Sequence, residues 1–244
     1  RVYEADFSKF DTPGTFRLAV RELGASLPFR IHEGTVALFA RTYALGLYHQ
    51  RCGASNGLPF TRHAHAECHL APVEIPNREL KTANEILAKV AGEMGSENGG
   101  GPAVKDFSSS LYPFVREGKV DASGGHHDAG DYSKYTINSA HLIHALAFAA
   151  EYFKGAGALD NLGIPESGDG KSDLLQEAKW EADYLLKLQD SDGGFSFLVY
   201  PRERRYEDNV LPEQGDPQIL WPKNTSATAA ATAALADMAA SKLF

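Results

Sequence analysis

The sequence predicts a mainly α-helical fold preceded by a short β segment, and three observations lead to this prediction. Apolar residues recur at helical spacing in several long stretches after residue 32. About the first thirty residues instead hold β-branched and aromatic runs between turn signals. Long, polar, Gly-rich loops join the helical stretches, and loops longer than about 12–15 residues in a compact domain are usually functional.

Composition and charge set the broad class of protein. The chain has 244 residues, of which 43% are hydrophobic and 23% charged, as in an ordinary globular protein with a sizeable core. This composition excludes disordered, collagen-like and coiled-coil chains. The 24 Lys and Arg against 32 Asp and Glu give a net charge of −8, which argues against nucleic acid as a partner because phosphate binding needs a basic surface. No apolar run approaches the roughly 18–20 residues of a membrane span.

The two ends of the chain lead us to expect a piece of a longer protein. The chain begins with Arg1 and has no apolar segment of the signal-peptide type. It stops inside its last helical stretch without a helix-ending Gly. We therefore expect that a leader has been removed or that the chain is an excised fragment.

Two short strands are expected before the helices. Thr15–Val20 follows the turn signal Asp11–Gly14, and Leu27–Ile31 is a second extended run. Two strands do not form a stable sheet alone in water. Residues 1–31 are therefore expected to be the closing strands of a β-sandwich whose earlier strands lie outside the chain.

Five helices are expected after residue 32. Ser172 is the expected N-cap of the fourth helix, because acidic Asp173 follows it in the first turn, where it suits the helix dipole. The fifth helix is rich in Ala. The expected ranges are 33–51, 78–94, 134–154, 172–189 and 226 to the end, with a Gly/Ser-rich loop over 95–110.

A pair of carboxylates is the strongest indication of chemistry in the sequence. Asp128 and Asp131 lie three residues apart between glycines, directly before the third helix. Small neighbours leave room for a ligand, and two nearby carboxylates can hold a water molecule and take its proton. The alternative interpretation is a structural one, in which Asp131 or Ser133 caps the helix.

A second cluster combines cysteine and histidine. Cys52, Cys68 and His69 supply three of the four ligands that zinc favours, and the candidates for the fourth are His63, His65 and His127. A Cys52–Cys68 disulfide and two unconnected buried thiols are the alternatives. The surrounding histidines favour a metal, because a disulfide needs none of them.

Two loops have weaker signals. The acidic run Ile164–Asp173 suggests a calcium site, although a turn with a helix N-cap explains it more simply. Aromatic residues in later loops are suited either to stack on sugar rings or to pack the helix ends. These aromatic residues are Phe195, Tyr200, Tyr206 and Trp221.

Several motifs in their order along the chain resemble glycoside hydrolase family 9, the inverting cellulase family. His127–Tyr132 is similar to the family's Asp-Ala-Gly-Asp block. Gln50–Gly53 and Ala66–His69 resemble the subgroup with an N-terminal immunoglobulin-like module. Further matches are Ile164–Gly168, Leu185–Gln189 with Asp192–Gly194, and Trp221–Lys223 with Thr225–Ala229. The resemblance covers nearly the whole chain and is weakest from Arg78 to Val120.

The resemblance implies a fold and a division into domains. The family folds as an (α/α)6 barrel with a substrate cleft across the ends of its helices. Residues 32–244 would form the N-terminal part of this barrel. Residues 1–31 would be the last strands of the immunoglobulin-like module, which Asp6–Ser8 and Thr12–Thr15 resemble.

The resemblance also implies roles for the clustered residues. Asp131 would be the catalytic base, and Asp128 would hold the attacking water opposite a general acid about 6.5–9.5 Å away. A structural zinc ion, bound beside Asp128, would brace the catalytic loop without taking part in the chemistry. Its ligands would be Cys52, Cys68, His69 and His127.

Three departures from the family pattern stand out. The family's general acid is a Glu near the C-terminal end of the barrel, and neither Glu166 nor Glu177 lies in a matching context. His126 occupies a position often held by an aromatic residue. The region 78–120 is longer than expected, which would remodel one end of the cleft.

The expected function is hydrolysis of β-1,4 bonds in cellulose or mixed-linkage β-glucan. An exo-acting β-glucosaminidase of the same family and a non-catalytic carbohydrate-binding fragment are the alternatives. The family resemblance implies a secreted or extracytoplasmic location. A half barrel would expose a large apolar helix face, so we expect the remaining C-terminal part of the barrel as a partner.

Overall fold

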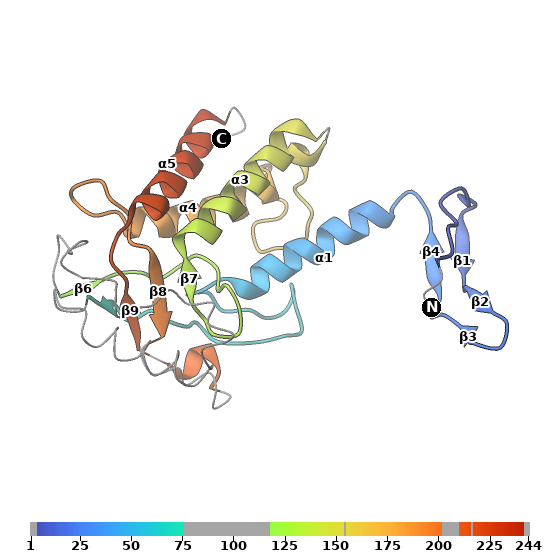
Figure 1. Cartoon of the computed structure of the whole chain (residues 1–244), viewed down its shortest axis with the longest axis horizontal. Coiled ribbons are helices and arrows are strands. Elements are labelled where there is room, and N and C mark those ends of the chain that lie inside the picture. Colours follow the sequence, from blue (N-terminus) through green and yellow to red (C-terminus); the bar gives the residue numbers. More distant parts are fainter. Residues whose placement is uncertain (1–3, 76–117, 154, 202–209, 216, 242–244) are drawn as a thin grey trace.

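The computed structural model describes residues 4–75, 118–153, 155–201, 210–215 and 217–241. Within them the predicted helices are confirmed to within a few residues at most ends, and the helix predicted over 78–94 lies outside the described residues. The helices, labelled in Figure 1, are α1 (Thr35–Gln50), α3 (Thr136–Tyr152), α4 (Asp173–Lys187) and α5 (Thr225–Ala240), with short 3-10 turns η3 (Ala156–Ala158) and η5 (Pro212–Gln214).

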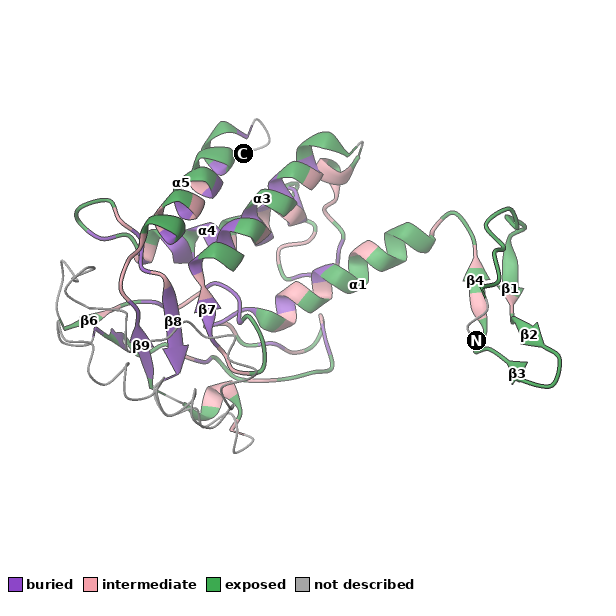
Figure 2. Cartoon of the chain, in the orientation of Figure 1, coloured by how far each residue is buried: buried purple, intermediate pink, exposed green. Residues whose placement is uncertain are grey.

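Helix α3 packs against both α4 and α5 and forms the centre of the core. Ile143 of α3 and Leu185 of α4 are fully buried there, as is Ala231 of α5. The many Ala residues of α3 and α5 allow the two backbones to approach closely, because they carry no bulky side chain. In Figure 2 the buried surface of these helices lies on their facing sides.

A five-stranded sheet lies at one end of the helices, and this corrects the expectation that everything after residue 32 is helical apart from loops. The pairs are antiparallel except β5–β9, which is parallel. Strands of two to four residues are too short for alternation to reveal them. In sheet order the strands are β6 (Lys119–Val120), β5 (Val73–Glu74), β9 (Gln218–Leu220), β8 (Leu198–Pro201) and β7 (Lys134–Tyr135).

Strand β7 leads directly into α3, so the sheet fixes the position of the loop that precedes it. The structure also decides between the two roles predicted for the aromatic residues in the later loops. Phe195, Tyr200 and Trp221 are buried in the core, so they pack the fold rather than stack on sugar. Tyr206 lies outside the described residues.

The segment before α1 forms two short antiparallel pairs. The predicted strand Thr15–Val20 divides into β1 (Gly14–Phe16) and β2 (Ala19–Val20). Strand β1 pairs with β4 (Phe29–Ile31), and β2 pairs with β3 (Gly24–Ala25). In Figure 1 these strands lie at the far end of α1, away from the other helices. Since no second sheet packs on them within the described residues, the immunoglobulin-like assignment of 1–31 stays a prediction.

Only the C-terminal half of α1 is packed. Ala44 and Tyr48 are buried in a small core with Ile164. The apolar positions nearer the start are open to solvent in the described structure, since Val36 is 78% exposed and Phe39 is 63% exposed. In Figure 2 the N-terminal half of α1 is mostly green, the colour of exposed residues.

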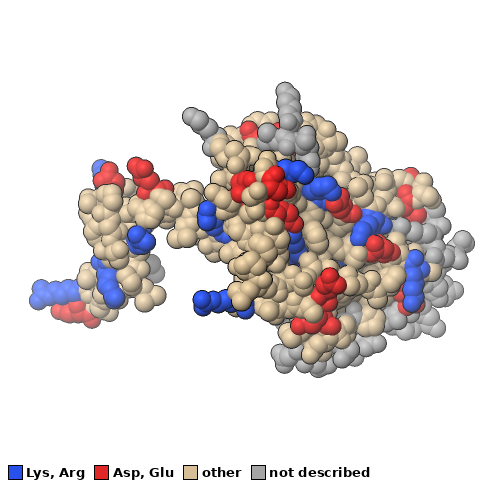
Figure 3. Space-filling view, turned by 180° about the vertical axis from the view of Figure 1, so that it is seen from behind, with Lys and Arg blue, Asp and Glu red and all other residues tan. Residues whose placement is uncertain are grey.

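No described helix is long and apolar enough to cross a lipid bilayer. On the face shown in Figure 3, basic and acidic side chains are interspersed. This face therefore carries charges of both signs.

Ser172 lies at the N-cap position of α4, as predicted, but its hydroxyl makes no capping hydrogen bond. The buried carboxylate of Asp173 orders the entry to the helix instead. Its Oδ2 accepts hydrogen bonds from the backbone N–H of Leu162 and the hydroxyl of Ser167, both at 2.7 Å. By contrast, Asn224 caps α5 by accepting from the N–H of Ala227 at 2.8 Å.

Removing the Asp173 carboxylate will destabilise the protein more than removing its neighbour's hydroxyl. Asp173→Ala leaves the buried Leu162 N–H and the Ser167 hydroxyl without their acceptor, which costs about 1–3 kcal/mol. Ser172→Ala removes a hydroxyl that makes no cap bond, and we expect a change within about 0.5 kcal/mol. Urea unfolding of both variants measures the difference, and equal losses would contradict this account of the helix start.

Candidate functional site

The loop that carries the predicted carboxylates, residues 124–132, begins with two glycines that the structure requires. Gly124 and Gly125 both have positive φ, 89° and 70°. A Cβ on Gly125 would lie 2.6 Å from the Tyr184 ring. The loop therefore runs closer to α4 than any other residue type would allow.

An antiparallel bridge joins this loop to the end of α1. Arg51 pairs with His126, and two backbone hydrogen bonds flank the pair. The N–H of Cys52 donates to the Gly125 carbonyl at 2.7 Å, and the N–H of His127 donates to the Gln50 carbonyl at 2.8 Å. Since successive residues of an extended chain point to opposite faces, the bridge directs Arg51 and His126 one way and their successors the other.

On one face of the bridge, the structure brings together the four side chains that the family resemblance marks as zinc ligands. Their ligand atoms all lie within 4.8 Å of one another, in the set Cys52, Cys68, His69 and His127. The His127 Nε2 to His69 Nδ1 distance is 3.3 Å, and each of these nitrogens lies 3.8 Å from a cysteine Sγ.

These distances fit zinc. In a tetrahedral site with Zn–N bonds of about 2.0–2.1 Å and Zn–S bonds of about 2.3 Å, two nitrogens lie about 3.3 Å apart and a nitrogen and a sulfur about 3.6 Å apart. Two thiols and two imidazoles are also a donor set typical of structural zinc. The residues present therefore suit this ion in both geometry and chemistry.

The alternatives for the cysteines are not formed. Both thiols are free, so there is no Cys52–Cys68 disulfide, and they lie in one cluster rather than apart. Of the other candidate ligands, His63 packs edge-on against His49, and His65 Nδ1 contacts the Ala66 carbonyl.

The electrostatics of the cluster favour the metal-binding forms of Cys52 and His127. A hydrogen bond from Cys68 and the charge of Lys134 hold the pKa of Cys52 well below its usual value despite burial. Sharing that proton raises the pKa of Cys68. Burial lowers the pKa of His127, so its ring is neutral, as a metal ligand must be.

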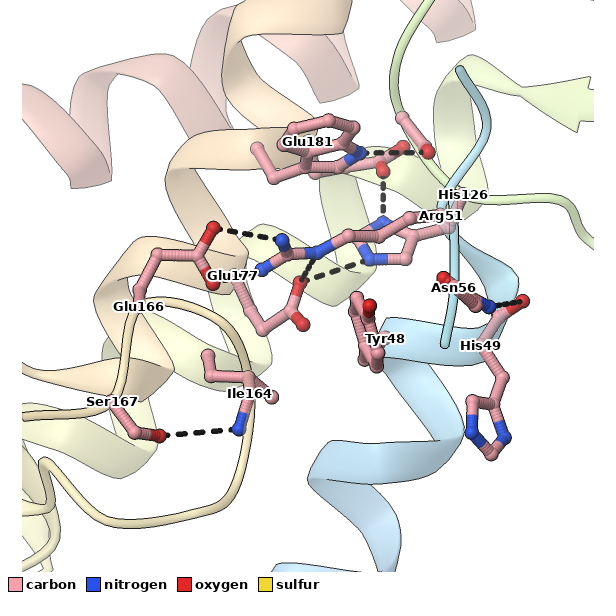
Figure 4. A network of polar contacts seen from close by, with 12 residues as sticks. Tyr48, His49, Arg51, Asn56, His126, Ile164, Glu166, Ser167, Glu177 and Glu181 are labelled. Carbon is pink, nitrogen blue, oxygen red and sulfur yellow. Dashed lines mark hydrogen bonds and ion pairs between the residues drawn. The ribbon is translucent and has the colours of Figure 1, made fainter. Parts of the chain in front are cut away.

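On the other face of the bridge lies a buried network of charged side chains, drawn in Figure 4. Arg51 Nε contacts Glu177 Oε2 at 3.0 Å, and its two terminal nitrogens bind both oxygens of Glu166 at 2.8 and 3.0 Å. The guanidinium also lies 4.8 Å from the centroid of the Trp180 ring. This two-pronged geometry ties the end of α1 to α4 and to the loop before α4.

His126 extends the network to the carboxylate loop. Its Nε2 lies 3.2 Å from Glu177 Oε2, and its Nδ1 contacts Glu181 Oε2. Although burial disfavours the charged ring, the Glu181 and Glu177 carboxylates raise the pKa of His126 to about 9. His126 and Arg51 in turn lower the pKa of Glu177 against the effect of burial. The ring is therefore protonated at neutral pH and bound to α4 on both sides.

Sequence reasoning missed this network, although α4 contains a signal for it. Glu177 and Glu181 lie in phase with buried Tyr184, Leu185 and Leu188, where an amphipathic helix normally places apolar residues. Acidic residues at such positions need buried partners. At His126 the family pattern often has an aromatic residue. The histidine fits here because its two ring nitrogens contact Glu177 and Glu181.

The two predicted carboxylates are each oriented by a neighbour. Asp128 is exposed, and its Oδ1 accepts from Asn138 Nδ2 at 2.6 Å. Asp131 is half-buried, and its Oδ1 accepts from the N–H and the hydroxyl of Ser133 at 3.1 and 2.8 Å. The capping alternative is wrong, because Tyr135 is the N-cap residue of α3 and no side chain caps it.

A cavity of about 240 Å³ opens beside Asp128, between α1, α3 and α4. Its walls include Gln50, Asn138 and the buried pair His126 and Glu181. There is therefore space next to Asp128 for water or part of a ligand.

The acidic loop before α4 has the character of a turn rather than of a calcium site. Asp160 accepts from the N–H groups of Gly168 and Gly170, and Asp169 accepts from that of Lys171. Glu166 is engaged by Arg51. Within the described residues, the Cys/His cluster is the one group with metal-binding geometry, so the calcium prediction gains no support.

Comparison with known proteins identifies the family. The model of glycosyl hydrolase family 9 matches residues 39–244. The chain belongs to glycosyl hydrolase family 9. This confirms the resemblance read from the motifs, and the Asp128–Asp131 loop, the bridge and the Cys/His cluster all lie within the matched range.

Curated relatives include Endoglucanase D of Acetivibrio thermocellus, 29% identical over 231 residues, which is 93% of this chain and 31% of that protein. A xyloglucan-specific endo-β-1,4-glucanase of Bacteroides ovatus is 28% identical over 190 residues, which is 78% of this chain and 27% of that protein. The chain thus spans about a third or less of the length of these relatives.

Solved structures show the same fold. A metagenome-derived family 9 endoglucanase superposes with a TM-score of 0.70 at 28% identity, over 96% of this chain and 37% of that one. A Zn-binding triple mutant of the family 9 endoglucanase J30 gives 0.69 at 26% identity, over 96% of this chain and 38% of that one. The described helices and sheet are therefore part of the glycosyl hydrolase family 9 fold.

The His126 network gives stability a specific pH dependence. The folded pKa of about 9 lies above the usual value of 6.5, so its contribution is fully present below about pH 6.5 and is lost as the pH rises through 9. In the complete, metal-saturated protein we expect a loss on the order of 2–3 kcal/mol between pH 6.5 and 9.5. Urea unfolding at several pH values measures it, with His126→Gln as the matched variant. A wild-type curve parallel to that of the variant would contradict the assignment.

Proposed function

We propose that the complete protein hydrolyses β-1,4-glucosidic bonds in cellulose or mixed-linkage β-glucan with inversion at the anomeric carbon. The observation that carries the proposal is the pair Asp128 and Asp131 on one anchored loop, each oriented by a neighbouring hydrogen-bond donor, with a cavity open beside Asp128. Membership of glycosyl hydrolase family 9 supports the reaction class.

Asp131 is the proposed general base. Ser133 occupies its Oδ1, and within the described residues its Oδ2 has no hydrogen-bond partner, so Oδ2 is the oxygen that takes a proton from water. Asp128 accepts from Asn138 through Oδ1 and directs its other oxygen to the same water. As the proton leaves, the water attacks the anomeric carbon from the face opposite the leaving group.

We assign the general acid to a glutamate of the remaining part of the barrel, as the family resemblance implies, because no described glutamate suits the role. The buried glutamates near the loop are already engaged, Glu177 by Arg51 and His126 and Glu181 by His126. A carboxylate that holds buried cations is poorly suited to donate a proton to a glycosidic oxygen. The rest of the barrel supplies the acid and also covers the exposed apolar surface around Val36 and Phe39.

The substrate class rests on the relatives. They include endoglucanases and a protein named cellulose 1,4-beta-cellobiosidase from Acetivibrio thermocellus. The solved structure of AaCel9A, 25% identical with a TM-score of 0.67, holds a cellobiose-like isofagomine. Because such polymers are found outside the cytoplasm, we place the protein in a secreted or extracytoplasmic location.

We further propose that Cys52, Cys68, His69 and His127 hold one structural zinc ion. Four protein ligands close the coordination shell, so a bound ion would fix the backbone and leave no position for a reacting water. His69 has a positive φ of 49°, a conformation that costs about 1–2 kcal/mol in a non-glycine residue and that metal ligation would maintain.

Asp131→Asn in the complete protein will lower kcat on barley β-glucan by about 10²–10⁴-fold, because an amide does not accept the proton of the attacking water. Asp183→Asn, which removes an exposed carboxylate paired with Lys179 on α4, is the matched control and keeps its activity. Near-normal turnover in Asp131→Asn would refute the base assignment. Activity on chitosan oligomers in place of β-glucan would favour the glucosaminidase alternative, and binding without cleavage the carbohydrate-binding alternative.

Elemental analysis of the purified complete protein will find one zinc ion at this site per chain. Cys68→Ser removes one thiolate and will lose that zinc and lower the melting temperature, because metal binding contributes to folding free energy. Wild-type protein that holds no zinc after refolding in its presence would refute the metal site while leaving the base assignment open.

A further inference from the structure

Lys134 is a fully buried cation whose three donors are all used. Its side chain is 0% exposed in strand β7, beside the metal cluster. Nζ donates to Cys52 Sγ at 3.3 Å, to the Gly124 carbonyl at 3.0 Å and to the Ala122 carbonyl. An ammonium group has three N–H bonds, so each of them finds an acceptor.

The cation has no carboxylate partner within the described residues. Its other close contact is the Tyr184 ring, whose centroid lies 4.5 Å from Nζ. A buried charge is costly unless an opposite charge or dipoles compensate it. The anion available within hydrogen-bond distance is the Cys52 thiolate.

We propose that Lys134 is a positioning residue of the metal site, whose ammonium group donates a hydrogen bond to the Cys52 thiolate and aims that sulfur at the zinc ion. This inference rests on the zinc site proposed above. The bond fixes the rotation of the Cys52 side chain and draws negative charge from the sulfur. Partners of this kind hold metal ligands in their binding geometry.

The position of Lys134 along the chain gives the contact a consequence for catalysis. His127 is in the cluster directly before Asp128, and Lys134 contacts the cluster three residues after Asp131. Both carboxylates therefore lie on a loop whose two ends meet at the metal site. The carbonyls of Ala122 and Gly124 extend the same attachment to the chain before the bridge.

The test compares Lys134→Met with Lys187→Met in the complete protein. Lys187 donates to the carbonyl and hydroxyl of Ser123 at 2.9 and 2.8 Å, so it holds the same stretch of chain but touches no cluster ligand. Zinc affinity is measured by competition with a chromophoric chelator. The charge-transfer band between sulfur and cobalt is measured after substitution with Co²⁺.

We expect Lys134→Met to weaken zinc binding by about 10–100-fold and to move the sulfur-to-cobalt band to longer wavelength, because the sulfur regains charge. Lys187→Met should change neither. Unchanged affinity and band position in Lys134→Met overturn the proposal, as do equal changes in both variants. If Lys134→Met does not fold, Lys134→Gln takes its place: a band at longer wavelength supports the proposal and an unshifted band overturns it.

The wild-type protein separates this proposal from the zinc site itself. If the wild type binds neither zinc nor cobalt, the zinc site and with it the role of Lys134 are both wrong. If the wild type binds zinc, and Lys134→Met binds it equally well with an unshifted cobalt band, only the role of Lys134 is wrong.

Discussion

The arrangement of the candidate site depends on the antiparallel bridge between Arg51 and His126. Two backbone hydrogen bonds join the end of α1 to the carboxylate loop at this point. Because side chains alternate along the bridge, one face presents Cys52 and His127 to the metal cluster and the other presents charged side chains to α4. Asp128 directly follows His127. The metal cluster on one face and the charged network on the other therefore both hold the backbone that carries the Asp128 carboxylate.

The sequence predicted the helices well because apolar spacing repeats over several turns in each. It failed for the sheet, whose strands of two to four residues carry no measurable period. Apolar spacing shows that one face of α1 is apolar but not what covers it, and the described structure leaves the N-terminal part of that face open. Tyr200 and Trp221 were ambiguous for the same reason, since an aromatic residue in a loop suits either a ligand or a core.

The candidate site was predictable where the residue types themselves indicate a chemical role. Cysteine and histidine in close spacing indicate a metal, and paired aspartates between glycines indicate acid–base chemistry. Arg51, Glu166 and Lys134 carried no such signal, because isolated charged residues normally lie at the surface and only the fold shows that Arg51 and Lys134 are buried. The family model and the solved structures agree with the motifs.

The most direct test of the anchored loop is residue-resolved amide hydrogen exchange of the complete protein with and without zinc. The two reporters are the N–H groups of Cys52 and His127, which flank the bridge. The account predicts that removing zinc with a chelator accelerates exchange at both by at least about tenfold, a local opening of the kind that exchange detects, while the buried core of α3 and α5 stays protected. Equal protection of the two bridge amides with and without zinc would contradict it.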